Sequence, residues 1–514
     1  MHRSNGLQLL HSLAEASSVA PLATQELEVT LPVLTSKTAA LILSAFPRLE
    51  RLRVGLWEPG EVYRERDEFD AAFAATLQRL LDRERGIPHL SFLDLERAPN
   101  TPDVRRALSG ATQLTGLKLP AVRTEVEAQA IAPLTSLRSL DLWCYDAPIL
   151  GALLSPLTAL TSLRLRGDGH LSPALAGLPR LASLDYSTGH LDVSVLATLT
   201  ALTWLSVRSL ALPAAAGDAF EALAAPAHRH PWQLPPGLTH IELTRQPPEA
   251  LHALRSSPMR KLTWFIDELE LEGKTHLDYY RDDDGDVAAD LTPHGEAALC
   301  AVAEFLAGRM ADDSWIGMVC TAEHRVRPIR CVGGPEEAGP GRRNHTPWLE
   351  AFGRAGVPQL ELDCFTLSYQ DFEALAGHTG LKVLQLGEYI KYPLPALLSL
   401  PLMSSLERLE LSADLWCRQA VENGEDAGGS DDDSGDPDGD QEPRARARAA
   451  ALPPDLPGVL SALLCLRRRL RLILVHNFGP SKQERRLLTA LVADVNSRVE
   501  RLGGDSTRLE ARDW

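Results

Sequence analysis

The sequence has few aromatic residues, few cysteines and no long apolar run. Phe, Trp and Tyr make up 5% of the 514 residues, and the seven cysteines are scattered and never spaced as Cys-x-x-Cys. An odd number of scattered cysteines fits a reducing compartment better than a disulfide framework. No window approaches a run of about 18 apolar residues, so the sequence predicts no membrane span.

Basic residues are also in short supply. The chain has 52 Lys and Arg residues against 69 Asp and Glu residues, which gives a net charge of −17. Nucleic acids and anionic membranes favour net positive surfaces, so the sequence argues against partners of both kinds. The N-terminal segment makes a poor secretory signal, while organellar import stays open because Glu15 is the only acid before Glu26. We therefore expect a cytoplasmic or nuclear protein.

Motifs for catalysis and cofactor binding are absent as well. The sequence has no G-x-x-x-x-G-K, no helix-opening G-x-G-x-x-G, no G-x-S-x-G and no H-E-x-x-H. The fragments that could ligate a metal, His228-Arg229-His230 and Cys320 with Cys331, lack the spacing of zinc ligands. We expect no enzyme activity, no cofactor and no metal.

What the sequence does contain is a repeat. Leucine recurs at positions 1, 4 and 6 of a short unit, as in the segments that start at Leu114, Leu137 and Leu160. From Leu90 to Leu202 the first leucines of the units are separated by 24, 23, 23, 21 and 21 residues. Positions 4 and 6 point to the same face of a strand, and one unit cannot bury that face alone. The units must therefore stack.

This pattern resembles the leucine-rich-repeat family, intracellular type, with short repeats of 21–25 residues. The resemblance implies an α/β solenoid, a horseshoe with one curved parallel sheet on the concave face and short helical turns on the convex face. It covers most of residues 45–415. One departure is that the asparagine which the family places three residues after the last strand leucine is missing throughout, with Ala98 in that slot of one unit.

Six segments are expected along the chain. They are an N-terminal cap (1–44), leucine-rich repeats (45–270), an irregular insertion or degenerate long repeat (271–356), further repeats (357–415), an acidic disordered linker (416–455), and a last strand from Leu470 with a C-terminal capping helix (456–514). Within the insertion, Thr292-Pro293 predicts the start of a helix, and residues 315–319 are typical of a strand.

Side chains at positions 3, 5 and 7 of each unit should point away from the core. At position 5 the charges alternate, and we expect them to form a ladder across the sheet: Asp94, Lys118, Asp141, Arg164 and Asp185. Aromatic rings at positions 3 and 7 are predicted on the solvent side: Phe92, Trp143, Trp204 and Trp264. Arginines flank them, namely Arg51, Arg53, Arg166 and Arg208. Such a composition is typical of the hot spots of protein interfaces.

The leading hypothesis is a non-catalytic scaffold that binds a protein partner on the concave face of the solenoid. Three alternatives stay open. The first is the substrate-recognition subunit of a ubiquitin ligase, although no F-box is visible in the first 45 residues. The second is an acidic-segment binder of basic nuclear proteins, and the third is an enzyme with its site in residues 271–356. The partner's identity and the oligomeric state do not follow from the sequence.

Overall fold

A computed structural model describes most of the repeat region and parts of both ends of the chain. The described residues are 25–31, 36–56, 66–82, 84–167, 172–211, 234–248, 251, 262–269, 271, 277–281, 287–318, 330–331, 345–363, 365–387, 390–412, 453–466, 470–476, 482–503 and 509–513. The predicted acidic linker lies outside these ranges except for residues 453–455.

One parallel sheet organises the structure. Among the described residues, sixteen strands form this open sheet in the order β1 to β10, β13, β15 to β19. Successive strands are neighbours, because each repeat adds one strand beside the last. The chain divides into two compact units, unit 1 (residues 1–244 and 253–258) and unit 2 (residues 245–252 and 259–514). Each is described by itself below.

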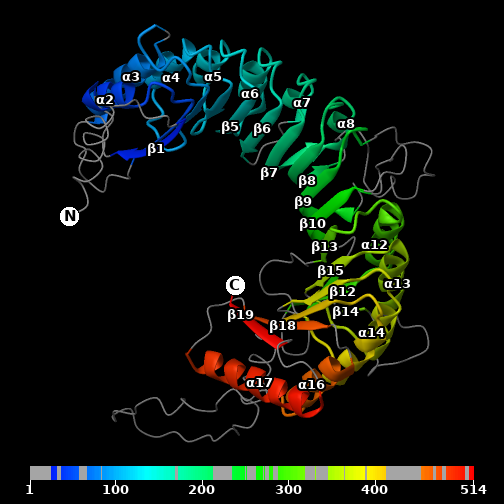
Figure 1. The fold of residues 1–514 in the computed structure, drawn as a ribbon. Helices are drawn as coiled ribbons and strands as arrows, with labels where there is room; N and C mark the ends of the chain where they lie inside the picture. Colours follow the sequence, from blue (N-terminus) through cyan, green and yellow to red (C-terminus); the bar gives the residue numbers. More distant parts are fainter. Residues whose placement is uncertain are drawn as a thin grey trace, which may run out of the picture. The chain divides into compact units, whose positions relative to one another are not determined.

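Unit 1 is built from short strands and short helices that alternate. The strands are β1 (Glu26–Leu31), β2 (Arg51–Leu56), β3 (Phe92–Asp94), β4 (Gly116–Lys118), β5 (Ser139–Trp143), β6 (Ser162–Arg166), β7 (Ser183–Asp192), β8 (Trp204–Ala211) and β9 (His240–Gln246). The helices are α2 (Ser36–Ala45), α3 (Arg66–Leu81), α4 (Pro102–Ser109), α5 (Glu125–Ile131), α6 (Ala147–Leu154), α7 (Ser172–Leu175) and α8 (Val193–Leu196). In Figure 1 these helices lie along one face of the unit 1 sheet. We call the opposite face the open face.

Local sequence fixes where the short helices begin. Thr101 caps α4, and its side chain accepts a hydrogen bond from the amide of Val104. Thr124 and Glu127 form a capping box at the start of α5. Caps of this kind satisfy backbone N–H groups that a helix leaves unpaired in its first turn. They allow a return segment of a few turns to be helical without an extended run of helix-forming residues.

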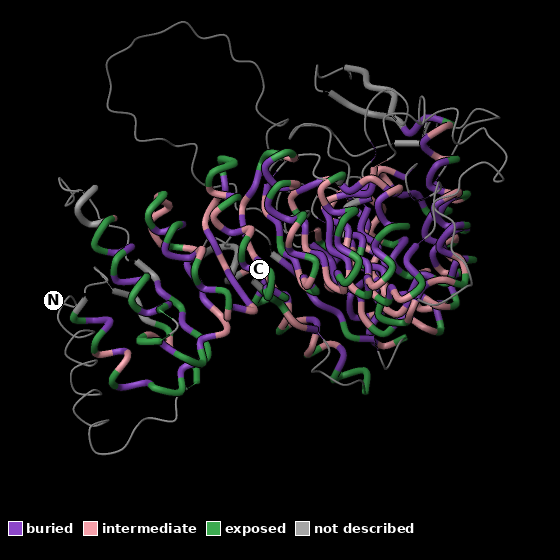
Figure 2. The backbone as a smooth tube through the Cα atoms, turned by 90° about the horizontal axis from the view of Figure 1, so that it is seen from above, coloured by how far each residue is buried: buried purple, intermediate pink, exposed green. Residues whose placement is uncertain are grey.

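The core of unit 1 lies between the sheet and these helices. The inward residues of successive strands pair leucine with leucine, as in Leu93 with Leu117 and Leu140 with Leu163. All four are 0–1% exposed. Burying a leucine side chain contributes roughly 1.5–3 kcal/mol, so the repeat leucines hold neighbouring units together. Figure 2 shows buried stretches recurring along the stacked repeats.

The missing asparagine is replaced at one turn by a different pair of side chains. Asn100, two residues past the expected slot, donates from Nδ2 to the carbonyl of Ala121 at 2.6 Å. Arg105 of α4 donates from Nε to Asn100 Oδ1 at 3.0 Å. Arg105 is only 2% exposed, and burial lowers its pKa to about 10. The carbonyl of Ala121 in the turn is therefore hydrogen-bonded by Asn100 before the helix and by Arg105 within it, and not by an asparagine in the expected slot.

Unit 2 repeats the arrangement with longer helices. Its strands in the main sheet are β10 (Thr263–Leu269), β13 (Trp315–Met318), β15 (Gln359–Leu362), β16 (Val383–Leu386), β17 (Arg408–Ser412), β18 (Arg471–His476) and β19 (Leu509–Asp513). The return segments are α12 (Pro293–Leu306), α13 (Thr346–Ala355), α14 (Tyr369–Ala376), the 3-10 helix η3 (Leu394–Leu402), α16 (Leu456–Leu466) and α17 (Lys482–Arg501). The strand predicted from Leu470 is present, but it is not the last, because β19 follows it and pairs with it.

The predicted insertion contributes to the main sheet. Thr292 caps α12 as predicted, and its hydroxyl accepts from the amide of Gly295 at 3.0 Å. The strand predicted at residues 315–319 is β13, which pairs in parallel with β10 and β15. A second, three-stranded sheet is formed by β11 (Leu277–Arg281), β12 (Val287–Leu291) and β14 (Arg330–Cys331). The insertion therefore includes one long repeat, extended by strands outside the main sheet.

A buried histidine is expected to make the stability of unit 2 depend on pH. The Nε2 atom of His378 lies 2.8 Å from the carbonyl oxygen of Leu349, and the residue is 2% exposed. Burial lowers the pKa of His378 below its ordinary value, although the Leu349 carbonyl opposes this change. Because the unfolded chain then binds a proton more readily than the folded one, stability should fall as pH drops below about 6.5.

Urea denaturation measured between about pH 7.5 and pH 5, a range of about 2.5 units that includes the ordinary histidine pKa, tests this expectation. We expect the free energy of unfolding to decrease toward the acid end, and we expect His378→Gln to flatten the decrease. A variant with an unchanged slope would show that other groups cause the pH dependence.

Candidate functional site

The predicted ladder residues lie side by side on the open face of unit 1. The strand register pairs Asp94 with Lys118, Asp141 with Arg164, and Arg164 with Asp185. Lys118 is paired with Asp141 between them. The structure also extends the row toward the N-terminus, where Asp94 is paired with Arg53, and Arg53 with Glu28. Charge alternates along all seven strands from β1 to β7. We call this row the charge ladder.

Short ion pairs link the charge ladder across strands. Arg53 Nε lies 2.7 Å from Asp94 Oδ2, and Arg164 Nε lies 2.5 Å from Asp185 Oδ2. Lys118 Nζ is 3.7 Å from Asp141 Oδ2. Pairs with a largely exposed partner contribute about 0.2–1 kcal/mol each, so their main effect is to hold the side chains in place.

Glu96, which the sequence analysis missed, forms ion pairs with cations on two other strands. Glu96 follows β3, and its Oε2 lies 2.5 Å from Lys118 Nζ. Its Oε1 lies 2.7 Å from Nη1 of Arg166, which belongs to β6. Position 7 of the unit that starts at Leu90 is Glu96, so the repeat register alone could have placed it on the open face.

Burial and ion pairing compete in this network. Burial tends to raise the pKa of Glu96, but hydrogen bonds from Lys118 and Arg166 outweigh it and lower that pKa below its ordinary value. Asp141 shows the opposite balance, because burial raises its pKa despite the charges of Arg166, Lys118 and Arg164. The hydrogen bond to Asp185 raises the pKa of Arg164. Arg164 therefore stays charged at neutral pH.

Three of the four predicted aromatic rings are partly exposed on the open face. Phe92 lies under Arg51, whose guanidinium carbon is 4.4 Å from the ring centroid. A Cβ atom at Gly116 would come within 2.4 Å of Phe92, so the glycine leaves the space that the ring fills. Trp143 lies under Arg166 at 5.4 Å. Cations over aromatic faces fix ring orientation and contribute roughly 0.5–1 kcal/mol at exposed sites.

Trp204 forms a flat aromatic pair with a histidine on the next strand. Its ring centroid lies 5.8 Å from that of His240, and the two planes differ by 7°. Leu205 beside it is fully buried, as the alternation of the strand requires. Arg208 lies four residues after Trp204 on β8, at position 7 of the unit, and is half-buried on the same face. Among the described residues it forms no ion pair with a carboxylate.

The prediction for Trp264 was wrong. Trp264 is fully buried in unit 2, where its ring meets the edge of Phe305 at 5.7 Å and 84°. The expected register took Leu262 as the first leucine of a unit. Ile266 pairs with Ile316, which in turn pairs with Leu360 at position 4 of its unit, so Ile266 holds position 4. The register is therefore displaced by one residue, which reverses the face of every side chain in the strand.

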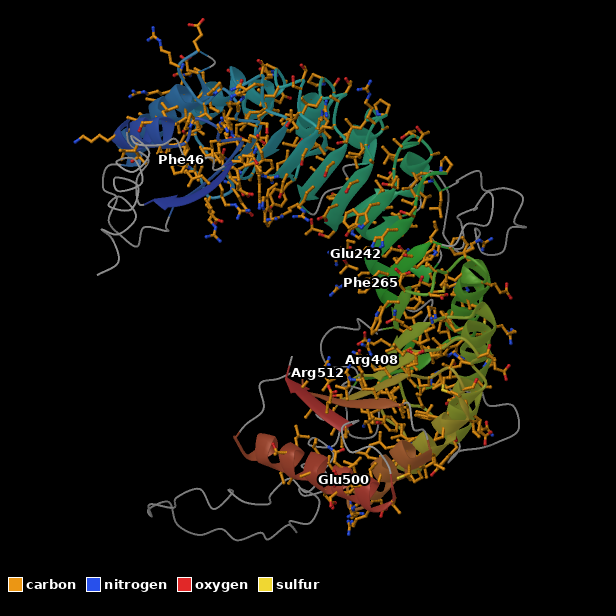
Figure 3. All side chains as sticks on the ribbon, viewed as in Figure 1. Phe46, Glu242, Phe265, Arg408, Glu500 and Arg512 are labelled. Carbon is orange, nitrogen blue, oxygen red and sulfur yellow. The ribbon has the colours of Figure 1, made fainter. Side chains whose placement is uncertain are left out.

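The same displacement reveals an aromatic pair that the sequence analysis missed. Phe265 is 36% exposed, and its ring stacks on that of Trp315 with centroids 6.3 Å apart and planes 19° apart. Figure 3 labels Phe265 on the side of unit 2 that faces away from the helices. Two features of the sequence could have identified this pair. Phe265 precedes the β-branched Ile266, and Trp315 begins the strand predicted at residues 315–319.

The ladder end near the N-terminus encloses a shallow depression on the open face of unit 1. Its volume is about 210 Å³, and its lining consists of Glu26, Arg51, Leu52, Arg53, Phe92, Asp94, Lys118, Asp141 and Arg164. The lining is mostly charged and contains one ring, Phe92. Among the described residues, no group of three His, Cys, Asp or Glu side chains is placed to hold a metal ion.

The strand register identifies the architecture. Leucine at position 4 pairs with leucine at position 4 from β3 through β8, as in Leu140 with Leu163 and Leu184 with Leu205. From β1 to β7, each strand is followed by a described helix on the opposite face. The chain has a leucine-rich-repeat fold. The short helices predicted for this fold are present in unit 1, and the sheet is open, not closed into a barrel.

Comparisons with other proteins return leucine-rich-repeat structures at low similarity. An internalin of Listeria monocytogenes is 16% identical over 62% of this chain and 81% of its own, with a TM-score of 0.32. A leucine-rich-repeat protein of Leptospira interrogans is 15% identical over 77% of this chain and 92% of its own, with a TM-score of 0.36. The TLR13–ssRNA13 complex gives 15% identity over 76% of this chain, with a TM-score of 0.35, and this chain covers 45% of that one.

No protein-family model matches the chain, and no curated protein matches it. The leucine-rich-repeat assignment therefore stands on the repeat and the strand register. Of the helices that the structure describes, none combines the length and the apolar character needed to cross a membrane.

Proposed function

We propose that the chain is a non-catalytic interaction module that binds a protein partner on the open face of unit 1. The observation that supports this proposal is the placement of Phe92, Trp143 and Trp204, three partly exposed rings on a face where the charges of the ladder are paired with one another. Rings held in place by neighbouring side chains lose little conformational freedom on binding, and such residues carry most of the energy of many interfaces. Three free cysteines, Cys144, Cys300 and Cys465, agree with a cytoplasmic or nuclear partner.

The arrangement of the rings suggests the form of the partner. Trp143 lies on β5 and Trp204 on β8, three strands apart in the sheet. At about 4.8 Å per strand this is roughly 14 Å across the sheet, and the register places Trp143 four residues, or roughly 13 Å, further along its strand than Trp204. The two positions are therefore roughly 20 Å apart, a spacing that suits an extended segment or a flat surface better than a single small molecule.

Replacing Trp204 with alanine should weaken partner binding by about 2 kcal/mol, or roughly 30-fold in Kd, with little loss of stability. The partner is first captured by affinity purification and identified by mass spectrometry, and binding of the purified pair is then measured by biolayer interferometry. Circular dichroism of the free variant reports whether the fold is intact.

Two further variants make this measurement specific. Tyr369→Ala removes a ring that is 50% exposed on helix α14 of unit 2, which is not part of the proposed surface, and should leave binding unchanged. Leu205→Ala removes a buried neighbour of Trp204 and should destabilise the fold. The proposal fails if Trp204→Ala binds like the wild type, or if Tyr369→Ala weakens binding as much.

A further inference from the structure

From β2 to β7 the arginines of the open face are more exposed than the aspartates. Arg53 and Arg164 of the charge ladder, and Arg51 beside it, have side chains that are about half exposed, at 52%, 51% and 53%. The aspartates of the ladder are far less exposed, at 5% for Asp94, 16% for Asp141 and 17% for Asp185. Lys118 is also shielded, at 17%, and the glutamates of β1 are exposed, at 73% for Glu26 and 63% for Glu28. Beyond β1, a partner approaching this face therefore meets guanidinium groups before the aspartates, although the chain as a whole carries a net charge of −17.

Side-chain length and backbone hydrogen bonds cause this asymmetry. Aspartates are short, and Asp94 is held down because its Oδ1 accepts from the amide of Glu96 at 3.0 Å. Arginines are long enough to reach over a neighbouring strand while their outer N–H groups remain at the surface. Each guanidinium has five N–H donors, and Arg164 uses Nε on Asp185 while its Nη1 lies at 4.0 Å from Asp141. Donors remain available for an incoming acceptor.

The arginines also surround a place where an acceptor could lie. Arg51, Arg53 and Arg164 line the same depression of about 210 Å³, with Phe92 beside Arg51. Four strand spacings separate β2 from β6 in the sheet. At about 4.8 Å per strand this is roughly 19 Å, which an extended peptide at about 3.3 Å per residue spans in roughly six residues.

We propose that this guanidinium rim, formed by Arg51, Arg53 and Arg164, binds the carboxylate side chains of an acidic, extended segment of the protein partner. The inference rests on the proposed function of the same face and adds the chemistry of the partner. Arginine binds carboxylates through paired N–H donors, and arginines line the depression from β2, with Arg51 and Arg53, and from β6, with Arg164. A nucleic acid is disfavoured, because the rim carries few cations and the carboxylates below it would repel a continuous phosphate backbone.

Fluorescence anisotropy with labelled peptides tests the proposal on the full chain. The probe is a peptide of about ten residues in which glutamate alternates with serine, which is long enough to span the roughly 19 Å rim. The same peptide with lysine in place of glutamate, and an oligothymidine of equal length, serve as competing probes. Three proteins are compared: the wild type, the double variant Arg51→Gln/Arg164→Gln, and the control Arg106→Gln, which removes an arginine that is 77% exposed on helix α4.

We expect the glutamate peptide to bind the wild type and to bind the double variant at least about 10-fold more weakly, with no change for Arg106→Gln. The double variant Arg51→Lys/Arg164→Lys keeps the charge but loses the planar donors, and should lie between the two. Absence of binding, an equal loss in Arg106→Gln, or tighter binding of the oligothymidine would each overturn the inference.

Binding measurements with the captured partner distinguish this inference from the proposed function. If Trp204→Ala weakens partner binding while Arg51→Gln/Arg164→Gln does not, the open face binds a protein but the acidic segment is ruled out. If the arginine variant weakens partner binding as it weakens peptide binding, the inference is supported on the natural partner.

Discussion

Replacing Trp264 with alanine is expected to lower the free energy of unfolding by about 3–5 kcal/mol, one of the two largest losses we expect from a single residue. The indole is fully buried between β10 and helix α12, and Phe305 meets its face edge-on at 5.7 Å. Truncation removes a large apolar group and leaves a cavity that the strand and the helix cannot both close. Urea denaturation followed by circular dichroism measures the loss.

The neighbouring residue provides the matched control. Phe265 lies one position further along β10 on the other face, and its stacking on Trp315 is partly exposed to solvent. Phe265→Ala should cost less than about 1.5 kcal/mol. If Phe265→Ala destabilised the fold more than Trp264→Ala, the displaced register that places Trp264 inside would be wrong.

A comparable loss, about 3 kcal/mol or more, is expected for Gly167→Ala in the turn after β6. Gly167 has a φ of +150°, which residues with a side chain rarely adopt. A Cβ atom there would also lie 2.1 Å from the carbonyl oxygen of Cys144, a backbone atom that cannot move without disturbing the neighbouring turn. Thr188 adds a further constraint, because its hydroxyl accepts from the Gly167 amide at 2.8 Å.

Gly110 separates this effect from the general effect of adding a methyl group. It ends helix α4 with a φ of −84°, and nothing lies within 4 Å of the place a Cβ atom would occupy. Gly110→Ala should therefore leave stability unchanged or raise it by about 0.4–1 kcal/mol, because alanine restricts the unfolded chain. Thermal unfolding of the two variants side by side distinguishes the outcomes, and an equal loss in both would contradict the argument from backbone conformation.

The repeat predicted the stacking order and the faces of the strands wherever the spacing of leucines was regular. Asp94, Lys118 and Asp141 follow from alternation within the strand and from neighbouring repeats, both of which are local rules. The rule failed at Trp264, because Leu262 fits the leucine pattern while Ile266 occupies position 4. A pattern of apolar letters does not separate two registers one residue apart when both place an apolar side chain inward.

The contacts beyond adjacent strands could not be predicted. Glu96 and Arg166 are 70 residues apart, and their ion pair depends on how two long side chains reach across the strands between them. The replacement of the asparagine slot by Asn100 and Arg105 is similar, because it depends on the angle at which helix α4 leaves its turn. Side-chain reach and turn geometry are properties of the folded chain that periodicity does not contain.

The alternation of the charge ladder limits how the number of repeats in unit 1 can change. Glu28, Arg53, Asp94, Lys118, Asp141, Arg164 and Asp185 occupy equivalent positions on consecutive strands. Excising the single repeat that carries Lys118 would place Asp94 beside Asp141, and like charges directly opposite each other destabilise a sheet. Excising two adjacent repeats would restore the alternation. The charge ladder therefore acts as a parity rule, under which this solenoid could be shortened or extended in pairs of repeats more readily than one at a time.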